Sequence, residues 1–151
     1  MNLFRVMEIS GSALLAERIR AEVTAANMAN AETTKTETGG PYQRMNVVFG
    51  ARPVGVNGFN GGFNGMMLAS LADMHAEDVR VVGLAGDTTP PIQRYEPGHP
   101  DADAQGYVAY PAINAAEEMV NLMGAARAYE MNASAVTSTK NMIQAAITIL
   151  S

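Results

Sequence analysis

Two segments, one at each end of the chain, carry apolar residues at alternating steps of three and four positions. Near the N-terminus the stripe is made mostly of small or β-branched residues: Ile9, Ser12, Ala16, Ile19, Val23, Ala26 and Asn30. Near the C-terminus only Lys140 interrupts the stripe, which is Met119, Leu122, Ala126, Tyr129, Ala133, Val136, Lys140, Ile143, Ile147 and Leu150. Such spacing is typical of helices that pack along a narrow seam. The pattern predicts a long helix at each end, over residues 1–32 and 114–151.

The start of the C-terminal helix has a recognisable cap. Asn114 precedes two alanines and the acids Glu117 and Glu118, which suit the free N–H groups and the positive end of the dipole. The helix should run for about thirty-six residues, or roughly 50 Å. A helix of this length with one narrow seam needs a partner, either in a hairpin within the chain or in an assembly of chains. Because both stripes reach almost to the termini, where ends normally fray, an assembly is favoured.

The middle segment, residues 33–113, has a different character. It contains all 7 prolines of the chain and most of its glycines. The short runs 45–50, 79–85 and 106–111 have the β-branched and aromatic content of strands bounded by turn residues. A Gly-rich insertion at 50–66 includes the repeat GFNGGFNG (58–65), which is either an adhesive contact loop or, as we favour, a flexible insertion.

Composition excludes several classes of function. The net charge of −5 and the scattered positions of the 10 basic residues argue against a nucleic-acid partner. Without cysteine, the chain has no disulfide, thiolate or cysteine–zinc chemistry. No apolar run reaches eighteen residues, so no membrane-spanning segment is expected. Charges at Arg5, Glu8, Glu17 and Arg18 interrupt the N-terminal segment, so no cleavable signal peptide is expected.

The acidic segment EPGHPDADAQG (96–106) is the one candidate metal site. A calcium loop that began at Asp101 would place Ala112 where a bidentate glutamate is required. A zinc site would need more histidines, and the only other one is His75. We therefore favour a structural turn over a metal site, and we expect no cofactor. Its residues are Pro97, His99, Pro100, Asp101, Asp103 and Gly106, with the aspartates accepting backbone N–H groups and the glycine allowing the reversal.

Four stretches together carry a resemblance to a known family. They are ISGSALLAERIRAEVTAANMANAETTKT (9–36), YEPGHPDADAQGYVAYP (95–111), NAAEEMVNLMGAARAYEMN (114–132) and TSTKNMIQAAITIL (137–150). The first contains an Asn-x-x-Asn-Ala-x-Thr-Thr corner formed by Asn27, Asn30, Ala31, Thr33 and Thr34, followed by Lys35-Thr36 where the family often has Gly and an aromatic residue. In this order, and over nearly the whole chain apart from residues 51–76, they resemble the flagellar basal-body rod and hook family, and in particular its proximal rod proteins.

The resemblance implies a structural subunit of the proximal rod, part of the torque-transmitting drive shaft. It implies export by the flagellar type III apparatus, assembly in the periplasmic part of the basal body, and contacts with other rod proteins and with copies of the chain. The fold class expected is mainly α, with long N- and C-terminal helices pairing as an antiparallel coiled coil and a small irregular β-containing middle segment. The expected interface residues are Ile9, Ala16, Ile19, Val23, Asn27, Asn30, Thr33, Thr34, Met119, Leu122, Ala126, Tyr129, Ala133, Val136, Ile143, Ile147 and Leu150.

The two asparagines of the corner carry a specific hypothesis. Asparagine is a poor residue for the middle of a helix, but it suits helix ends and buried positions that fix register. We expect Asn27 and Asn30 to bond across to the C-terminal helix or to a neighbouring subunit. The alternative is that they mark the simple end of a helix.

Two other classes of function were weighed against a structural subunit. An enzyme, such as a cell-wall hydrolase, would need a convergent catalytic group, and the sequence has no Gly-x-Ser-x-Gly or His-Glu-x-x-His arrangement. A secreted adhesive or another extracellular assembly module could use GFNGGFNG, but the polar faces of the terminal helices are not Lys-rich as those of interfacial helices are. The structural subunit explains more of the sequence.

Overall fold

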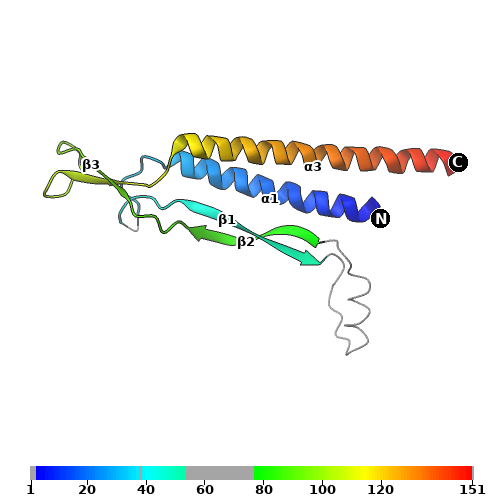
Figure 1. Ribbon diagram of the computed structural model, residues 1–151, viewed down its shortest axis with the longest axis horizontal. Coiled ribbons are helices and arrows are strands. Elements are labelled where there is room, and N and C mark those ends of the chain that lie inside the picture. The colour runs from blue at the N-terminus through cyan, green and yellow to red at the C-terminus, as the bar shows by residue number, and fades with distance from the viewer. Residues whose placement is uncertain (1–2, 38, 54–76, 151) are drawn as a thin grey trace, which may run out of the picture. The chain divides into compact units, whose positions relative to one another are not determined.

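A computed structural model describes residues 3–37, 39–53 and 77–150, with a long helix at each end of the chain (Figure 1). In order, the elements are α1 (Leu3–Ala29), β1 (Met45–Pro53), β2 (Glu77–Gly86), β3 (Ile92–Tyr95), β4 (Tyr107–Tyr110) and α3 (Ala115–Leu150). Both predicted helices are therefore confirmed. The side-chain oxygen of Asn114 accepts the N–H of Ala116 at 3.0 Å, which confirms the predicted cap of α3. The repeat at 58–65 and His75 lie outside the described residues.

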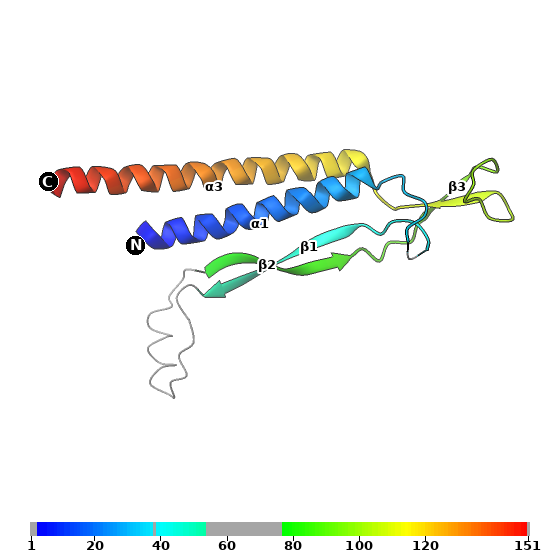
Figure 2. The same cartoon turned by 180° about the vertical axis from the view of Figure 1, so that it is seen from behind.

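The described part of the middle segment forms two separate two-stranded sheets (Figure 2). Strands β1 and β2 make one, and β3 and β4 make the other, in antiparallel register from Ile92 opposite Tyr110 to Tyr95 opposite Tyr107. Strands β1, β2 and β4 were predicted. Strand β3 was not, because its 4 residues are too few to show a period of two and prolines stand on both sides of it.

The chain divides into two compact units, and each terminal helix contributes to both. Unit 1 draws its described residues from the ranges 1–17, 49–82 and 127–151, and unit 2 from 18–48 and 83–126. Within unit 1, the Ser12 hydroxyl accepts the backbone N–H of Val79 at 3.2 Å and so ties α1 to β2. Within unit 2, the end of α1 meets the start of α3 through Asn27 and Glu118. Neither described helix combines the length and the apolarity needed to cross a bilayer.

Helix α3 buries a different line of residues from the predicted stripe. Glu118, Ala125 and Thr139 are buried and Asn132 is half-buried, at steps of seven. Leu122, Val136 and Ile143, from the predicted stripe, are half-buried beside them, whereas Met119, Ala126, Tyr129 and Ile147 are exposed. The difference has an electrostatic cause, since Glu118 has to face its partner Arg44 and thereby fixes the rotation of the helix. Several large apolar residues of α3 are consequently left exposed by the chain itself.

Helix α1 is covered over most of its circumference. Its exposed positions include a narrow line at steps of three and four, made of Phe4, Glu8, Gly11, Leu15, Arg18, Glu22, Ala25 and Ala29. In the predicted stripe, Ala16 is buried, Ile9, Ile19 and Val23 are half-buried, and Ala26 is exposed. The weakly amphipathic sequence of α1 fits this environment, because a helix covered on several sides has no single apolar face.

Candidate assembly interface

A cluster of hydrogen bonds around Asn27 joins three elements of unit 2. The Asn27 amide donates to the carbonyl of Met45 at 2.8 Å and to Glu118 Oε2 at 3.2 Å. Its oxygen accepts the N–H of Met45 at 3.0 Å and the Tyr42 hydroxyl at 3.1 Å. Asn27 is 2% exposed, and these four bonds use the full capacity of a side-chain amide. Met45 is the first residue of β1. The Asn27 amide pairs with both its N–H and its carbonyl, as the backbone of a neighbouring strand would.

Arg44 and Glu118 form the charged part of the same cluster. The guanidinium donates from Nε and Nη2 to Glu118 Oε1, at 2.9 Å and 2.5 Å. Glu118 is 2% exposed, and a carboxylate buried to this extent is tolerated only when it is paired and hydrogen-bonded. Asp87 and Glu117 lie near the same guanidinium, at 3.6 Å and 3.7 Å. We call Asn27, Tyr42, Arg44, Met45 and Glu118 the Asn27 cluster.

The ionisation of two residues in the Asn27 cluster reflects this arrangement. Burial, followed by the negative charge of Glu118, raises the pKa of the Tyr42 hydroxyl. Burial by itself would lower the pKa of Arg44, but the hydrogen bond and charge of Glu118, with Glu117 and Asp87, raise it above its usual value. The pKa of Asp87 is lowered, mainly because its carboxylate accepts hydrogen bonds from the hydroxyl and N–H of Thr89, and secondarily because of Arg44. The surroundings thus favour the neutral phenol of Tyr42 and the charged guanidinium of Arg44.

Asn27 and Asn30 have different roles. The bond from Asn27 to Glu118 is the expected link to the C-terminal helix. Asn30 instead donates to the carbonyl of Ala26 at 2.9 Å and accepts the Thr33 hydroxyl at 3.2 Å. Within the described residues its side chain makes no bond to α3 and closes the end of α1 locally, while the alternative of a bond from Asn30 to a neighbouring subunit stays a prediction.

The Thr-Thr corner after α1 is tied to the acidic segment at 96–106. The Thr34 hydroxyl donates to Asp101 Oδ2 at 2.8 Å, and Lys35 Nζ lies 3.9 Å from Asp101 Oδ1. Thr33 closes the helix end through its N–H, which donates to the Asn30 carbonyl at 3.1 Å. The carboxylate of Asp101 therefore joins two segments sixty-seven positions apart in the sequence.

The segment 96–106 is a hydrogen-bonded loop between β3 and β4. Asp103 Oδ1 accepts the N–H groups of Gln105 at 2.9 Å and Tyr107 at 2.8 Å. His99 Nδ1 accepts the N–H of Asp101 at 3.1 Å. Gly106 is buried and has φ of 85°, a conformation that disfavours residues with a Cβ. Pro97 and Pro100 are exposed, and among the described residues no group of three or more His, Cys, Asp or Glu side chains could hold a metal ion.

The expected interface residues differ in their accessibility. Asn27 and Ala16 are buried within the chain. Half-buried are Ile9, Ile19, Val23, Asn30, Thr33, Thr34, Leu122, Ala133, Val136 and Ile143. Exposed are Met119, Ala126, Tyr129 and Ile147, while the side chain of Leu150 lies outside the described ones.

Large apolar side chains remain exposed along α3. They are Met119, Val120, Met123, Tyr129, Met131, Met142, Ile147 and Ile149, with Met131 67% exposed and Tyr129 44% exposed. At 100° per residue, Met119, Val120, Met123 and Met131 lie on the side of the helix opposite the buried line through Glu118 and Ala125. We call these four residues the outer face of α3. The exposed Arg127 and Glu130 lie on the same side of the helix, so charge interrupts this face, and exposed apolar side chains gathered in this way are typical of interaction sites.

The comparisons with known proteins agree with one another. Residues 7–35 match the family model described as flagella basal body rod protein, and residues 104–149 match that of the flagellar basal body rod FlgEFG protein C-terminal. The flagellar basal-body rod protein FlgC of Borreliella burgdorferi is 37% identical over 99% of both chains. FlgC of Escherichia coli O6:H1 is 35% identical over 99% of this chain and 98% of that one, and FlgC of Bacillus subtilis is 33% identical over 99% of both.

The chain belongs to the FlgC family of flagellar basal-body rod proteins. It is a structural subunit of the basal-body rod and not an enzyme. The ranges matched by the two family models include Asn27 and Glu118 but not the third segment of the Asn27 cluster, which contains Tyr42, Arg44 and Met45.

Sequence reasoning missed most of the Asn27 cluster. Glu118 was noted only as an acid in the first turn of α3, and neither Arg44 nor Tyr42 was assigned a role. The one available signal was the run of two adjacent acids after a helix cap, but local sequence does not indicate which of them is buried. The partner Arg44 is 74 positions away, which no local pattern can reveal.

Proposed function

We propose that this rod subunit assembles through the exposed apolar side chains of its terminal helices, which pack against copies of the chain and other rod proteins. The observation that carries the proposal is the outer face of α3, where Met119, Val120, Met123 and Met131 are exposed in the single chain. Full burial of an exposed side chain of this size contributes about 1.5–3 kcal/mol, and these four are 48–67% exposed, so covering each contributes roughly half of that. The free energy gained by burying all four side chains would offset part of the entropic cost of association.

The Asn27 cluster supports this mode of assembly from within the chain. Because Asn27 and Glu118 join the end of α1 to the start of α3, the two helices are fixed against each other at this point. We propose that they continue from there as an antiparallel coiled coil, with the buried line through Glu118, Ala125, Asn132 and Thr139 as its seam on α3. The outer face is then presented in a defined direction.

The resulting mechanism is mechanical rather than chemical. Torque that passes through a rod is carried by subunit contacts, and many small packing contacts share the load. A charged pair such as Arg44 and Glu118 resists sliding of one segment along the other, since moving it would separate two desolvated charges.

We also propose that the chain reaches the periplasmic part of the basal body through the flagellar type III export apparatus, without a cleavable signal peptide. The support is the likeness to relatives named as basal-body rod proteins. Secretion of the chain into the medium should stop when the export apparatus is deleted. The mass of the secreted chain, measured by mass spectrometry, should equal that of the chain inside the cell.

The assembly proposal is tested by replacing the outer face in a strain that lacks the wild-type gene. The double variant Met123→Asp and Met131→Asp places charge where the proposal requires apolar contact, and it should abolish rods in purified basal bodies. Arg127→Ala lies between the two positions on the same side of the helix but adds no charge to it, and it serves as the control, with rods expected at wild-type number. Wild-type numbers of rods in the double variant would show that this face is not an interface.

A further inference from the structure

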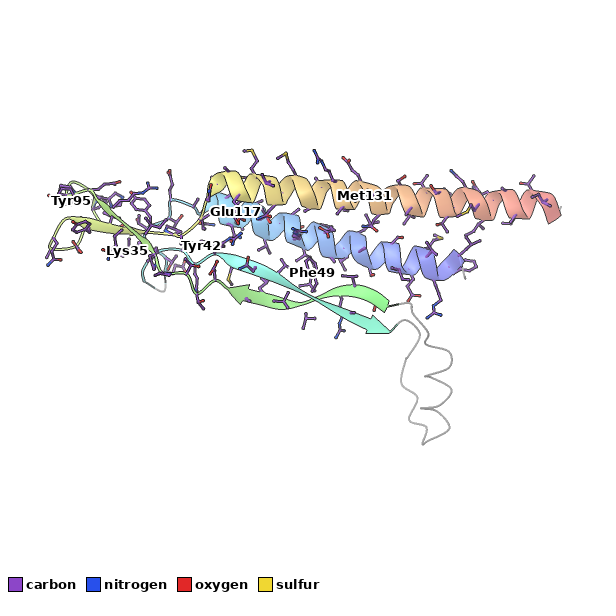
Figure 3. All side chains as sticks on the ribbon, in the orientation of Figure 1. Lys35, Tyr42, Phe49, Tyr95, Glu117 and Met131 are labelled. Carbon is purple, nitrogen blue, oxygen red and sulfur yellow. The ribbon has the colours of Figure 1, made fainter. Side chains whose placement is uncertain are left out.

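The β3–β4 hairpin carries an exposed pair of aromatic side chains that none of the contacts above explains. Tyr95 and Tyr107 stand opposite each other in the register of the two strands, and their rings meet edge to face with centroids 5.4 Å apart. Tyr95 is 64% exposed and Tyr107 43% exposed. Figure 3 shows Tyr95 on this hairpin.

The two faces of the hairpin differ sharply. Alternation along the strands places Val108 and Tyr110 on one face, where both are buried and Arg94 lies over the Tyr110 ring at 4.6 Å. Tyr95 and Tyr107 belong to the other face. The hairpin therefore already has a buried side with its own aromatic and cationic contacts, and the tyrosine pair adds nothing to that side.

The pair is also held in a fixed orientation. A Cβ at Gly106 would come within 2.9 Å of Tyr95 Cε2 and 3.2 Å of Pro97 Cβ, so the Tyr95 ring lies directly against the glycine. The Asp103 carboxylate holds the backbone of Tyr107 at 2.8 Å. Rigid aromatic side chains lose little entropy on binding, which is why exposed and pre-ordered tyrosines act as anchors in protein interfaces.

The charge around the pair defines its partner. From Tyr95 to Tyr107 the sequence has Glu96, Asp101 and Asp103 and neither lysine nor arginine. Two described cations have other contacts, since Arg94 lies over the Tyr110 ring and Lys35 lies near Asp101 of this loop. Electron-rich rings at the two ends of an acidic loop attract a lysine or arginine side chain, which can stack on a tyrosine face at about 6 Å or less from its centroid.

We propose that Tyr95 and Tyr107 form a docking site for a lysine or arginine side chain of a neighbouring protein subunit. This site lies on the hairpin, apart from the outer face of α3. The inference rests on the proposed function for the presence of neighbouring subunits. The tyrosine pair would give the subunit a second contact, between aromatic rings and a cation, besides the apolar contact of the outer face.

The test replaces Tyr95 in the full-length chain in a strain without the wild-type gene. Tyr95→Phe keeps the aromatic face and should leave incorporation into basal bodies unchanged. Tyr95→Leu keeps the apolar area but removes the ring, and should lower incorporation about tenfold. Thermal unfolding of the purified variants separates a folding defect from a docking defect, because the inference requires Tyr95→Leu to fold like Tyr95→Phe. Equal incorporation of the two variants would overturn it.

A second measurement identifies the partner even if Tyr95→Leu folds poorly. A photo-reactive phenylalanine analogue, p-benzoylphenylalanine, is placed at position 95 or, as a reference, at position 131. The inference expects cross-links from position 95 to a peptide of another subunit that contains lysine or arginine near the cross-linked residue. Cross-links from position 131 without any from position 95 would overturn the inference and leave the proposed function standing. Absence of cross-links from position 131 would count against the outer face instead.

Discussion

The side-chain amide of Asn27 donates to Glu118 Oε2 at 3.2 Å, between two residues that are each 2% exposed and 91 positions apart in the sequence. The same carboxylate accepts Arg44 through its other oxygen. Because both residues are buried and their bonds depend on one another, neither side chain can be removed without leaving polar groups unpaired. The relationship fixes where the end of α1 stands against the start of α3.

Asn27→Ala should destabilise the folded chain by about 3 kcal/mol, since four hydrogen bonds are lost and buried groups of Met45 and Glu118 are left unpaired. Asn30→Ala is the matched control, because among the described residues the Asn30 side chain bonds to its own helix end, and the substitution should cost less than about 1 kcal/mol. Urea unfolding followed by circular dichroism measures both. Similar losses of unfolding free energy in the two variants would mean that the Asn27 cluster does not stabilise the fold.

Arg44 and Glu118 should show a large coupling energy. Arg44→Met or Glu118→Leu alone leaves one buried charge without its main partner, at a cost of about 3–5 kcal/mol. The double variant should lose much less than the sum, with a coupling of about 2 kcal/mol in a double-mutant cycle of unfolding free energies. Additive losses would show that the two side chains act independently.

Gly106→Ala should destabilise the β3–β4 hairpin by about 1–2 kcal/mol, because φ of 85° is unfavourable for a residue with a Cβ. The new methyl group would also press on the Tyr95 ring. Gly98→Ala in the same loop meets no atom within 4 Å and serves as the control with little effect. Hydrogen exchange of the amides of β4 would report the local loss, and equal protection in both variants would contradict it.

Tyr129→Ala should weaken assembly more than Arg127→Ala. The tyrosine ring is 44% exposed in the single chain, so its removal should change the unfolding free energy by less than about 1 kcal/mol. If neighbours cover the ring, incorporation into purified basal bodies should fall on the order of tenfold. Arg127→Ala should change incorporation by less than about twofold. Matching defects would exclude a special role for the ring.

Tyr110 should make the fold sensitive to alkaline pH. Its hydroxyl donates to Glu96 Oε2 at 2.9 Å, and this bond raises the pKa of Tyr110, so the folded chain favours the neutral phenol. The stabilisation is fully present below about pH 10, the value of an unfolded tyrosine, and is lost as the pH rises through the higher pKa of the folded state. The urea midpoint of the wild type should therefore fall more between pH 8 and pH 11 than that of Tyr110→Phe. An equal fall of the urea midpoint in the wild type and in Tyr110→Phe would show that the bond from Tyr110 to Glu96 is not coupled to folding.

Patterns that lie close together in the sequence determined the secondary structure. The steps of three and four, with Asn114 as a cap, predicted α3 because helix formation depends on residues within one or two turns. Runs rich in β-branched and aromatic residues predicted β1, β2 and β4 for a similar reason. Strand β3 is different, because Ile92 to Tyr95 becomes a strand only through its pairing with β4.

The sequence by itself thus determined the two terminal helices, three of the strands and, through motifs in a fixed order, the likeness to rod proteins. Only the tertiary structure decided which side of α3 is buried. Apolar periodicity alone predicts that Met119 and Ala126 lie on the buried side. Instead, Glu118 pairs with Arg44 and Asn27, and this pairing turns the helix so that Glu118 and Ala125 face inward. The reason is that a buried charge and its distant partner must meet, and that requirement outweighs a difference of a few methyl groups along a helix.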